Sequence, residues 1–304
     1  MKTFAELKTQ DFLEPTAVPA SESQRQAWQA ANRAWWELHP MRYDWGQALA
    51  GGPGERAWFE EIDRRFFSAS VVPSGRRPFD GLIPFETLKN ANVLEIGVGM
   101  GSHAQLLAGA SRRFVGIDLT TQATVATRRR FSLFGLPGEI LQMNGELLAF
   151  SDHTFDVIWT WGVIHHSANT RAVLAEMRRV LKPSGRAFVM VYHRALVPWY
   201  IYGGLLHGVL QGGLLRHRGI HPLVQSYTDG ALARYYTPQE WTTQIAGLFQ
   251  IERMKTYGNR AESLPLPSGA LKRKLLAFLP ESFLRFWLTS CRQGTMLFSS
   301  LRPI

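Results

Sequence analysis

The sequence is poor in cysteine, in acidic residues and, near its start, in unbroken apolar runs. Cys291 is the single cysteine of the 304 residues, which excludes an intrachain disulfide and a cysteine-based metal site. Glu6, Lys8 and Asp11 interrupt the first residues, where a secretion signal needs a continuous apolar stretch. We therefore expect a cytoplasmic protein, reduced and without a bound metal.

The shortage of acids leaves a formal net charge of +10, from 34 Lys and Arg against 24 Asp and Glu. Such a balance is found in proteins that bind nucleic acid or an anionic membrane, and in proteins with an ordinary basic surface. The basic residues form short clusters at 128–130, 216–218 and 272–274 rather than one stripe with interleaved aromatics. We expect no nucleic-acid partner, leave peripheral membrane contact open, and make no prediction of the oligomeric state.

Residues 93–102 form the most informative stretch, Val-Leu-Glu-Ile-Gly-Val-Gly-Met-Gly-Ser. A short apolar strand, three alternate glycines and a helix start follow one another, and glycines allow the backbone to turn sharply beside a ligand. This order predicts the start of a nucleotide-binding βαβ unit. The dinucleotide fingerprint has Gly or Ala where this chain has Ser102, which argues against a bound pyrophosphate.

Strand and helix patterns alternate after this turn. The predicted strands are 93–97, 113–118, 138–143, 155–160 and 186–192, and the predicted helices are 102–109, 120–133 and 169–181. Such alternation is typical of an α/β fold with a doubly wound, mostly parallel sheet and helices on both faces. The second strand ends in Asp118, where a carboxylate can accept hydrogen bonds from both hydroxyls of a ribose.

The flanking regions divide the chain further. Residues 1–85 are predicted to hold a loose arm and two amphipathic helices, one ending near Pro40 and one at 55–67. Tyr43 and Trp45 lie between these helices, either in a rigid aromatic connection or in a lid over the site. Residues 86–304 are predicted to form the main domain, and helical insertions are expected at about 196–235 and 262–290.

The first insertion contains an uncharged stretch, 197–215, that is long enough to span a bilayer. Its position directly after a core strand argues against a span, which leaves contact with a lipid surface or a helical cap over the mouth of the site. In the second insertion, Leu271, Leu275, Leu276 and Leu279 share one predicted helix face, beside Lys272-Arg273-Lys274.

Four segments, in order, resemble the class I S-adenosylmethionine-dependent methyltransferases over about residues 90–195. They are the glycine turn, the strand that ends in Asp118, the segment 141–150 and the helix-to-strand junction 181–190. The resemblance implies a Rossmann-like, seven-stranded sheet with an antiparallel strand near its end, a place that predicted strands at 249–257 and 295–301 can fill. It also implies S-adenosylmethionine as the cofactor.

The resemblance assigns roles to individual residues. Glu95 would hold the ammonium of the methionine portion and Asp118 the ribose, while Asn144, in place of the usual Asp, would accept from the adenine amino group. Gly145 would offer its backbone N–H to the adenine ring. The other residues expected at the cofactor are Gly97, Gly99, Gly101, Leu119 and Trp161, and Tyr43 and Trp45 are expected in the lid.

His165 and His166 follow the predicted strand 155–160, and imidazole titrates near neutrality. Each is a candidate general base, which a hydroxyl, thiol or acidic carbon nucleophile requires; a packed or capping residue is the alternative. Adjacent histidines point apart, so they do not form a metal pair. We expect a biosynthetic enzyme that methylates a small, partly apolar metabolite, with O-methylation favoured. The alternatives are C-methylation of a quinone-like or polyketide-like acceptor, RNA or protein methylation, and a non-catalytic scaffold.

Overall fold

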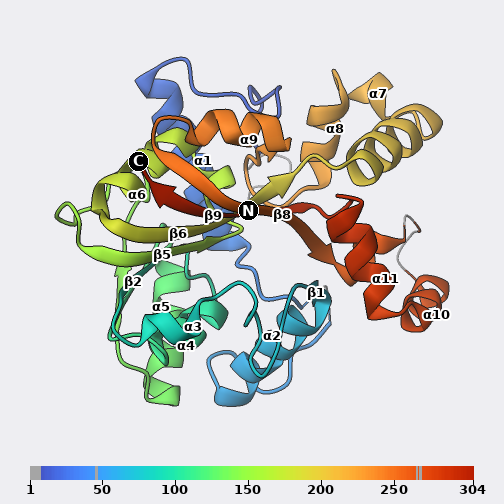
Figure 1. Ribbon diagram of the computed structural model, residues 1–304. Helices are drawn as coiled ribbons and strands as arrows, with labels where there is room; N and C mark the ends of the chain where they lie inside the picture. The colour runs from blue at the N-terminus through green and yellow to red at the C-terminus, as the bar shows by residue number, and fades with distance from the viewer. Residues whose placement is uncertain (1–7, 45–46, 265, 267–268) are drawn as a thin grey trace.

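The computed structural model describes residues 8–44, 47–264, 266 and 269–304, so Trp45 lies outside the described residues. Five parallel strands form the centre of one sheet (Figure 1): β2 (Asn92–Ile96), β3 (Arg113–Asp118), β4 (Glu139–Gln142), β5 (Phe155–Trp161) and β6 (Leu181–His193). All five predicted parallel strands are therefore confirmed, to within a few residues at their ends.

Two long antiparallel strands complete the sheet. β9 (Met296–Pro303) pairs with β6, and β8 (Phe249–Asn259) pairs with β9. The order is β1-β8-β9-β6-β5-β2-β3-β4, with β7 (Tyr235–Tyr236) beside β6. The doubly wound α/β prediction is confirmed, but the described residues contain nine strands rather than seven. The additional strands, β7 and β1 (Ser70–Val71), have two residues each, too few to produce an alternating pattern.

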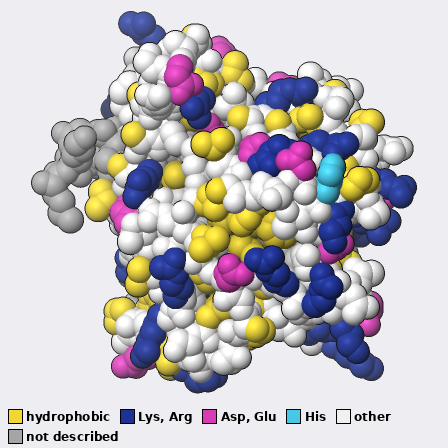
Figure 2. Space-filling model, turned by 90° about the vertical axis from the view of Figure 1, so that its left-hand side faces the viewer, with side chains coloured by type: hydrophobic (Ala, Val, Ile, Leu, Met, Phe, Trp, Pro, Cys, Tyr) yellow, Lys and Arg dark blue, Asp and Glu magenta, His cyan; other side chains and the backbone are white. Residues whose placement is uncertain are grey.

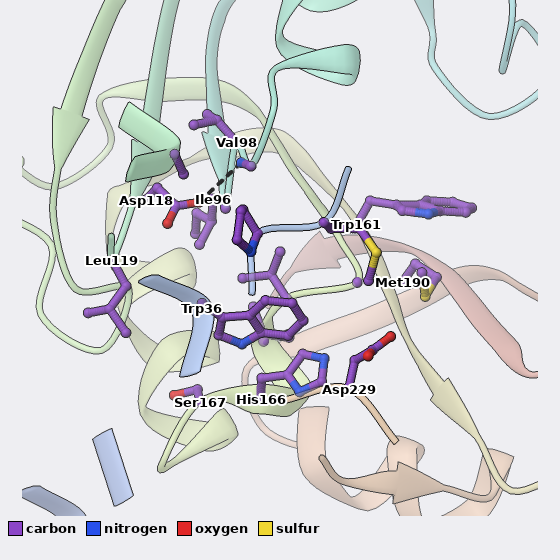
Figure 3. A pocket seen from close by; sticks show the side chains of 18 of the residues that line it. Trp36, Ile96, Val98, Asp118, Leu119, Trp161, His166, Ser167, Met190 and Asp229 are labelled. Atoms are coloured by element: carbon purple, nitrogen blue, oxygen red, sulfur yellow. Dashed lines mark hydrogen bonds between the residues drawn. The ribbon is translucent and has the colours of Figure 1, made fainter. Parts of the chain in front are cut away.

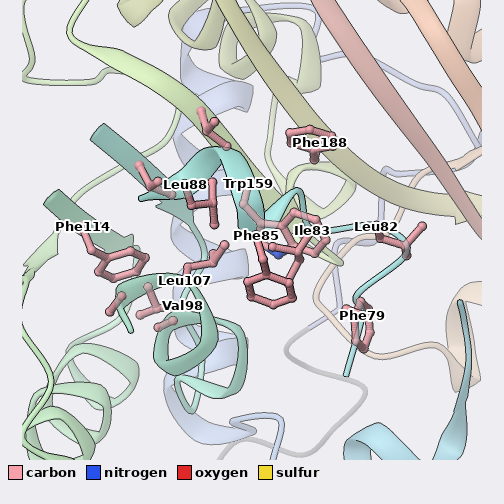
Figure 4. Close-up of a cluster of buried hydrophobic side chains, with 14 of the residues drawn as sticks. Phe79, Leu82, Ile83, Phe85, Leu88, Val98, Leu107, Phe114, Trp159 and Phe188 are labelled. Carbon is pink, nitrogen blue, oxygen red and sulfur yellow. The ribbon is translucent and has the colours of Figure 1, made fainter. Parts of the chain in front are cut away.

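Helices cover both faces because successive residues of a strand point to opposite sides. Val93 packs on one face with α3 (Phe85–Leu88) and α4 (Ser102–Ala108), where Figure 4 shows Leu107 near Trp159. Leu94 packs on the other face with α6 (Thr170–Val180) and α9 (Pro238–Ile245). The further helices of the core are α2 (Arg56–Ala69) and α5 (Thr121–Phe134).

Local capping signals in the sequence are reproduced. Thr237 caps α9 in a reciprocal arrangement with Glu240, and Pro238 occupies the first turn, as its sequence predicts. Asn169 caps α6 through the backbone N–H of Ala172. These caps set where the helices start relative to the strand ends, and hence where the intervening loops lie.

The N-terminal arm is not loose in its described part, contrary to our prediction. The backbone N–H of Thr9 donates to Ala231 (2.9 Å), and that of Tyr235 donates to Pro15 (2.9 Å). Phe12 is buried against Trp28 of α1 (Glu22–Leu38). A short polar segment has no periodicity that could reveal such docking, because its partners lie more than 200 residues away in the chain.

Both predicted insertions contain short helices. The first holds η3 (Leu196–Leu210), a π-helix, followed by α7 (Gly213–Arg216) and α8 (Ile220–Tyr227). The second holds α10 (Ala270–Phe278), α11 (Glu281–Arg285) and the π-helical turn η5 (Phe286–Ser290). In the described ranges, no helix combines the length and apolarity required to cross a bilayer.

A buried ion pair joins α5 to α2. Arg130 has no solvent exposure, and its Nη1 donates to both carboxylate oxygens of Asp63 at 2.9 and 2.8 Å. The same guanidinium lies over the ring of Phe59 and bonds to the backbone oxygen of that residue (3.4 Å). A buried charge is stable only while it is paired, so this contact fixes α2 on α5.

We predict that Asp63→Ala lowers the free energy of unfolding by about 3 kcal/mol, because it leaves Arg130 buried without its carboxylate. Glu60→Ala on the same helix breaks only the exposed contact with Arg56, 3.9 Å long, and should change stability by less than about 0.5 kcal/mol. Urea unfolding followed by circular dichroism measures both. Equal effects of the two substitutions would contradict the role of the buried pair.

Candidate functional site

A cavity of about 670 Å³ opens where the parallel strands end at their carboxyl termini (Figure 3). This edge is the usual ligand-binding position of a doubly wound sheet. Ten of the residues singled out from the sequence line it: Tyr43, Glu95, Gly97, Gly99, Asp118, Leu119, Asn144, Gly145, Trp161 and His166. Gly101 and His165 are not among the lining residues. The cavity thus gathers residues from the ends of four strands and from the N-terminal region.

The glycine turn requires glycine for two separate reasons. Gly97 and Gly99 have φ values of 84° and 52°, a region that side chains disfavour. A Cβ on Gly97 would also lie 2.2 Å from the side chain of Val163, in the loop after β5. Gly101 caps α4 with φ 82° and faces Thr127 rather than the cavity. Glycine is therefore needed at position 101 for the turn into the helix, and not for contact with a ligand.

Asp118 supports the same turn from β3. Its Oδ2 accepts the backbone N–H of Gly99 (3.1 Å), and its Oδ1 accepts the N–H and the hydroxyl of Thr120 (3.0 and 2.8 Å). Burial raises the pKa of Asp118, and these hydrogen bonds oppose that rise. The carboxylate is thereby held in one orientation at the cavity wall.

Glu95 is a buried carboxyl group with an oxygen that is not hydrogen-bonded within the described part of the chain. The residue is 2% exposed, and among the described residues its Oε2 has no hydrogen-bond partner. Burial and then the nearby Asp118 raise the pKa of Glu95 well above its usual value, while Arg130 opposes the rise. A buried carboxylate is unfavourable unless a positive group compensates it. The end of the cavity beside Glu95 therefore suits a cationic ligand, as S-adenosylmethionine is.

Asn144 presents its amide differently from our expectation. Its Oδ1 already accepts from Nε2 of Gln29 (2.8 Å) and from the backbone N–H of Glu146 (3.0 Å). Gln29 is oriented in turn by the N–H of Ala168, which donates to its Oε1 (3.1 Å). Because backbone donors fix both amides, the oxygen is saturated and Asn144 offers a ligand its Nδ2, a donor rather than an acceptor.

The N-terminal helix α1 forms one wall of the cavity, through Gln29, Asn32 and Trp36. Arg25 of this helix pairs with the buried Glu146 at 2.7 Å. Farther along, the ring of Tyr43 stacks on Phe66 with centroids 4.6 Å apart. Sequence reasoning missed Gln29 and Trp36, since a polar and an aromatic residue on an amphipathic helix carry no signal of a ligand site.

The two adjacent histidines have different surroundings. Nδ1 of His166 lies 2.8 Å from the carbonyl oxygen of Leu232, so this nitrogen carries the proton. Nε2 then holds a lone pair, and the described residues supply no donor to it. Burial lowers the pKa of His166 to about 4, which keeps the ring neutral at physiological pH. His165 instead packs on Tyr192, with ring centroids 3.9 Å apart and both nitrogens unbonded within the described chain.

The far end of the cavity is aromatic, and two further acids, Asp229 and Glu262, line the cavity. Tyr192, Tyr227, Tyr235 and Asp229 line it, and Figure 3 shows Asp229 beside His166. Burial raises the pKa of Asp229, and the positive charges of Lys8 and His39 partly counter the rise. Asp229 was not singled out from the sequence. Its only signal is the Thr-Asp-Gly turn, which does not reveal that the loop folds back over the cavity.

Comparison with known proteins agrees with this geometry. Residues 94–189 match the methyltransferase domain family, a region that contains the glycine turn, Asp118, Asn144 and both histidines. The resemblance stated from the sequence is confirmed for this part of the chain, which matches the methyltransferase domain family.

Three curated relatives illustrate the range of the family. The chain is 30% identical over 36% of its length to a tRNA U34 carboxymethyltransferase of Cellvibrio japonicus, of which the match covers 35%. It is 29% identical over 36% of its length to a ubiquinone/menaquinone biosynthesis C-methyltransferase of Francisella tularensis, covering 46% of that protein. It is 33% identical over 32% of its length to a fatty-acid O-methyltransferase of Mycolicibacterium smegmatis, covering 36%. The chain thus matches less than half of each relative.

We predict that Gly97→Ala abolishes cofactor binding, because the new Cβ would force Val163 and the turn apart. Gly135→Ala is the matched control: Gly135 also has a positive φ (62°), but no atom lies within 4 Å of the position that its Cβ would take. The control should lose about 1 kcal/mol of stability and keep its binding. Calorimetric titration with S-adenosylmethionine distinguishes the two. Retained affinity in Gly97→Ala would contradict the proposed position of the ligand.

Proposed function

We propose that the protein transfers a methyl group from S-adenosylmethionine to a small, partly apolar metabolite, and that the acceptor atom is an oxygen. The observation that carries the proposal is the division of one cavity into two ends. One end has the glycine turn with the buried Glu95 and the half-buried Asp118, and the other has aromatic rings with Asp229. The first end fits a cationic nucleoside, and the second fits an apolar acceptor with one polar group.

The cofactor end supplies a partner for each polar part of the ligand. Glu95 would take the ammonium, and Asp118 would accept from the ribose hydroxyls with the lone pairs that Gly99 and Thr120 leave. The Nδ2 of Asn144 and the backbone N–H of Gly145 would donate to adenine ring nitrogens. When bound, S-adenosylmethionine supplies a methyl group that its sulfonium has already activated. The protein has then to position the acceptor and exclude water.

His166 is the proposed general base. His166 lines the cavity and the described residues supply no hydrogen-bond partner to its buried Nε2, whereas His165 is not among the lining residues. A neutral imidazole with a lowered pKa is a weak base by itself. Asp229 precedes Gly230, whose backbone lies against the ring of His166, and its carboxylate would stabilise the imidazolium that forms. A hydroxyl or carboxyl acceptor would donate its proton to Nε2 as the bond to the methyl carbon forms. This pair is the reason that an oxygen acceptor is favoured.

The chemistry of the far end favours a lipid-like or aromatic acceptor. Met190, Tyr192, Tyr235 and Met296 line it, side chains that pack well on apolar chains and rings. Two of the relatives are named for a fatty acid and for a quinone, acceptors of this kind. C-methylation of a quinone-like ring remains the second candidate, because His166 and Asp229 would also serve an acidic carbon.

Transfer of label from methyl-tritiated S-adenosylmethionine to long-chain fatty acids and to hydroquinones tests the proposal. The O-methyl product of either class supports it, and a C-methyl product on the ring supports the second candidate. Cofactor binding without transfer to any acceptor of these classes would contradict the small apolar acceptor.

We predict that Glu95→Gln weakens cofactor binding about 10- to 100-fold, the loss of one hydrogen bond to a charged group. Binding of an ammonium requires the ionised carboxylate of Glu95, whose pKa is raised. The affinity of the wild type for S-adenosylmethionine should therefore fall as the pH decreases through this raised pKa. The variant should lose this pH dependence. Glu86→Gln, whose side chain is exposed, is the control. Titration calorimetry at several pH values provides the measurement.

We predict that His166→Gln lowers kcat about 100-fold or more and leaves cofactor affinity intact. Because the pKa of Asp229 is raised, kcat/KM should fall as the pH decreases through the pKa of this carboxyl group. In Asp229→Asn, the fall of kcat/KM at low pH should move toward pH 4, where His166 titrates. His165→Phe, at the packed neighbour, should leave kcat nearly unchanged. A loss of kcat in His165→Phe as large as that in His166→Gln would reverse the assignment.

A further inference from the structure

The π-helix η3 has an apolar outer face. In a π-helix each residue bonds to the fifth along, so residues four and five apart lie on the same side. Those exposed on η3 follow this spacing: Leu196, Tyr200, Ile201, Leu205, Val209 and Leu210. The buried residues alternate with them on the inner side: Trp199, Gly203, Gly204 and Gly208. The helix thus has one face that packs on the protein and one apolar face toward solvent.

The apolar face continues beyond η3 and recurs in the second insertion. Leu215, at the end of α7, is 93% exposed. In α10 and the helices after it, exposed apolar side chains are Leu271, Leu275, Phe278, Phe283 and Phe286, and Phe278 is 85% exposed. Figure 1 shows η3, α7 and α8 above α10 and α11 on the same side of the molecule. Val197 at the start of η3 also donates to Gln293, which follows η5 (3.0 Å).

Positive charge accompanies these apolar side chains. Residues 195–228 and 263–280 contain no Asp or Glu, but the exposed basic residues there include Arg216, Arg218, Arg273 and Lys274. The opposite side of the molecule differs, because Asp and Glu lie among its Lys and Arg (Figure 2). An exposed apolar surface with basic residues beside it is the combination that binds an anionic lipid interface.

The same segment borders the cavity. Trp199, on the inner side of η3, packs on Tyr235 with ring centroids 4.7 Å apart, and a Cβ on Gly203 would lie 3.2 Å from the hydroxyl of Tyr227. Tyr227 and Tyr235 both line the far end of the cavity. The outer apolar face and the acceptor end are therefore separated by the thickness of one helix.

We propose that the outer faces of η3–α7 and α10–α11 seat the protein on an anionic lipid bilayer. The surface lies on the headgroup region without crossing it, in keeping with the short helices of the described segments. A second copy of the chain is a poorer occupant, because two basic, acid-poor faces repel each other. Delivery of an amphiphilic acceptor from the bilayer into the cavity rests on the proposed function, whereas the docking itself does not.

The test is cosedimentation of the full chain with vesicles of phosphatidylcholine, with and without about one third phosphatidylglycerol. We expect binding to the anionic vesicles only, weakened when salt rises from about 0.1 to 0.5 M. Leu205→Glu/Val209→Glu should weaken binding at least about tenfold, because it removes apolar area that the bilayer would bury. Arg216→Glu/Arg218→Glu should do the same by removing two positive charges near the surface.

Matched controls carry the same changes elsewhere. Val18→Glu/Val125→Glu alters two valines that are 57% and 56% exposed, and Lys89→Glu/Arg129→Glu reverses two exposed charges. All four variants should keep the wild-type thermal midpoint and cofactor affinity, and the controls should bind vesicles as wild type does.

Absence of vesicle binding by the wild type, or equal losses of binding in the controls, would overturn the proposal. The proposal would also be overturned if the chain formed a dimer at high concentration, if Leu205→Glu/Val209→Glu dissociated this dimer, and if vesicles did not compete with its formation. Because no acceptor is needed, failure here would leave the methyl-transfer proposal standing.

Discussion

The placement of two carboxyl groups, the buried Glu95 and the half-buried Asp118, at the ends of adjacent strands is the constraint on which the site depends. Asp118 is tolerated because backbone and hydroxyl donors surround it, and those donors belong to the turn that it holds. The described residues supply no such donor to Oε2 of Glu95, and the positive charge of Arg130 offsets only part of the rise in the pKa of Glu95, so a cationic ligand would favour its ionised form. The turn is fixed from both sides, by Asp118 on β3 and by Val163 after β5. The cavity is consequently shaped before any ligand enters.

The wall opposite the sheet is built from segments that are distant in the chain. Glu146 accepts from Arg25 of α1, from the hydroxyl of Ser167 and from the backbone N–H of Asn169 (2.8 Å). Arg234 donates to the carbonyl oxygens of Ser167 and Ala168, and thus approaches the same loop from its other side. The loop after β5, which carries both histidines, is held between these two charged groups. The position of His166 is therefore a property of the whole assembly rather than of its own strand.

How far the sequence predicts this structure depends on the range of the interactions. The parallel strands and α6 follow from local periodicity, and these predictions hold. The placement of Gln29 against Asn144 does not follow from local periodicity, because the two residues are 115 positions apart and Gln29 is oriented by a backbone donor from a third segment, Ala168. Similarly, the leucines of α10 share a pattern, but Leu276 is buried while Leu271 is 67% exposed. A pattern identifies an apolar face without saying what covers it.

The docking of the N-terminal arm has a consequence for how the chain folds during synthesis. Arg234 bonds to the carbonyl oxygen of Ala17 (2.8 Å), and Tyr235 and Ala231 bond to Pro15 and Thr9. On the ribosome the arm emerges long before residues 231–235 are synthesised. The contacts of the arm with residues 231–235 therefore form only after those residues have been translated. Closure of the ligand cavity is thus among the last steps of folding, and contacts of such long sequence separation form slowly.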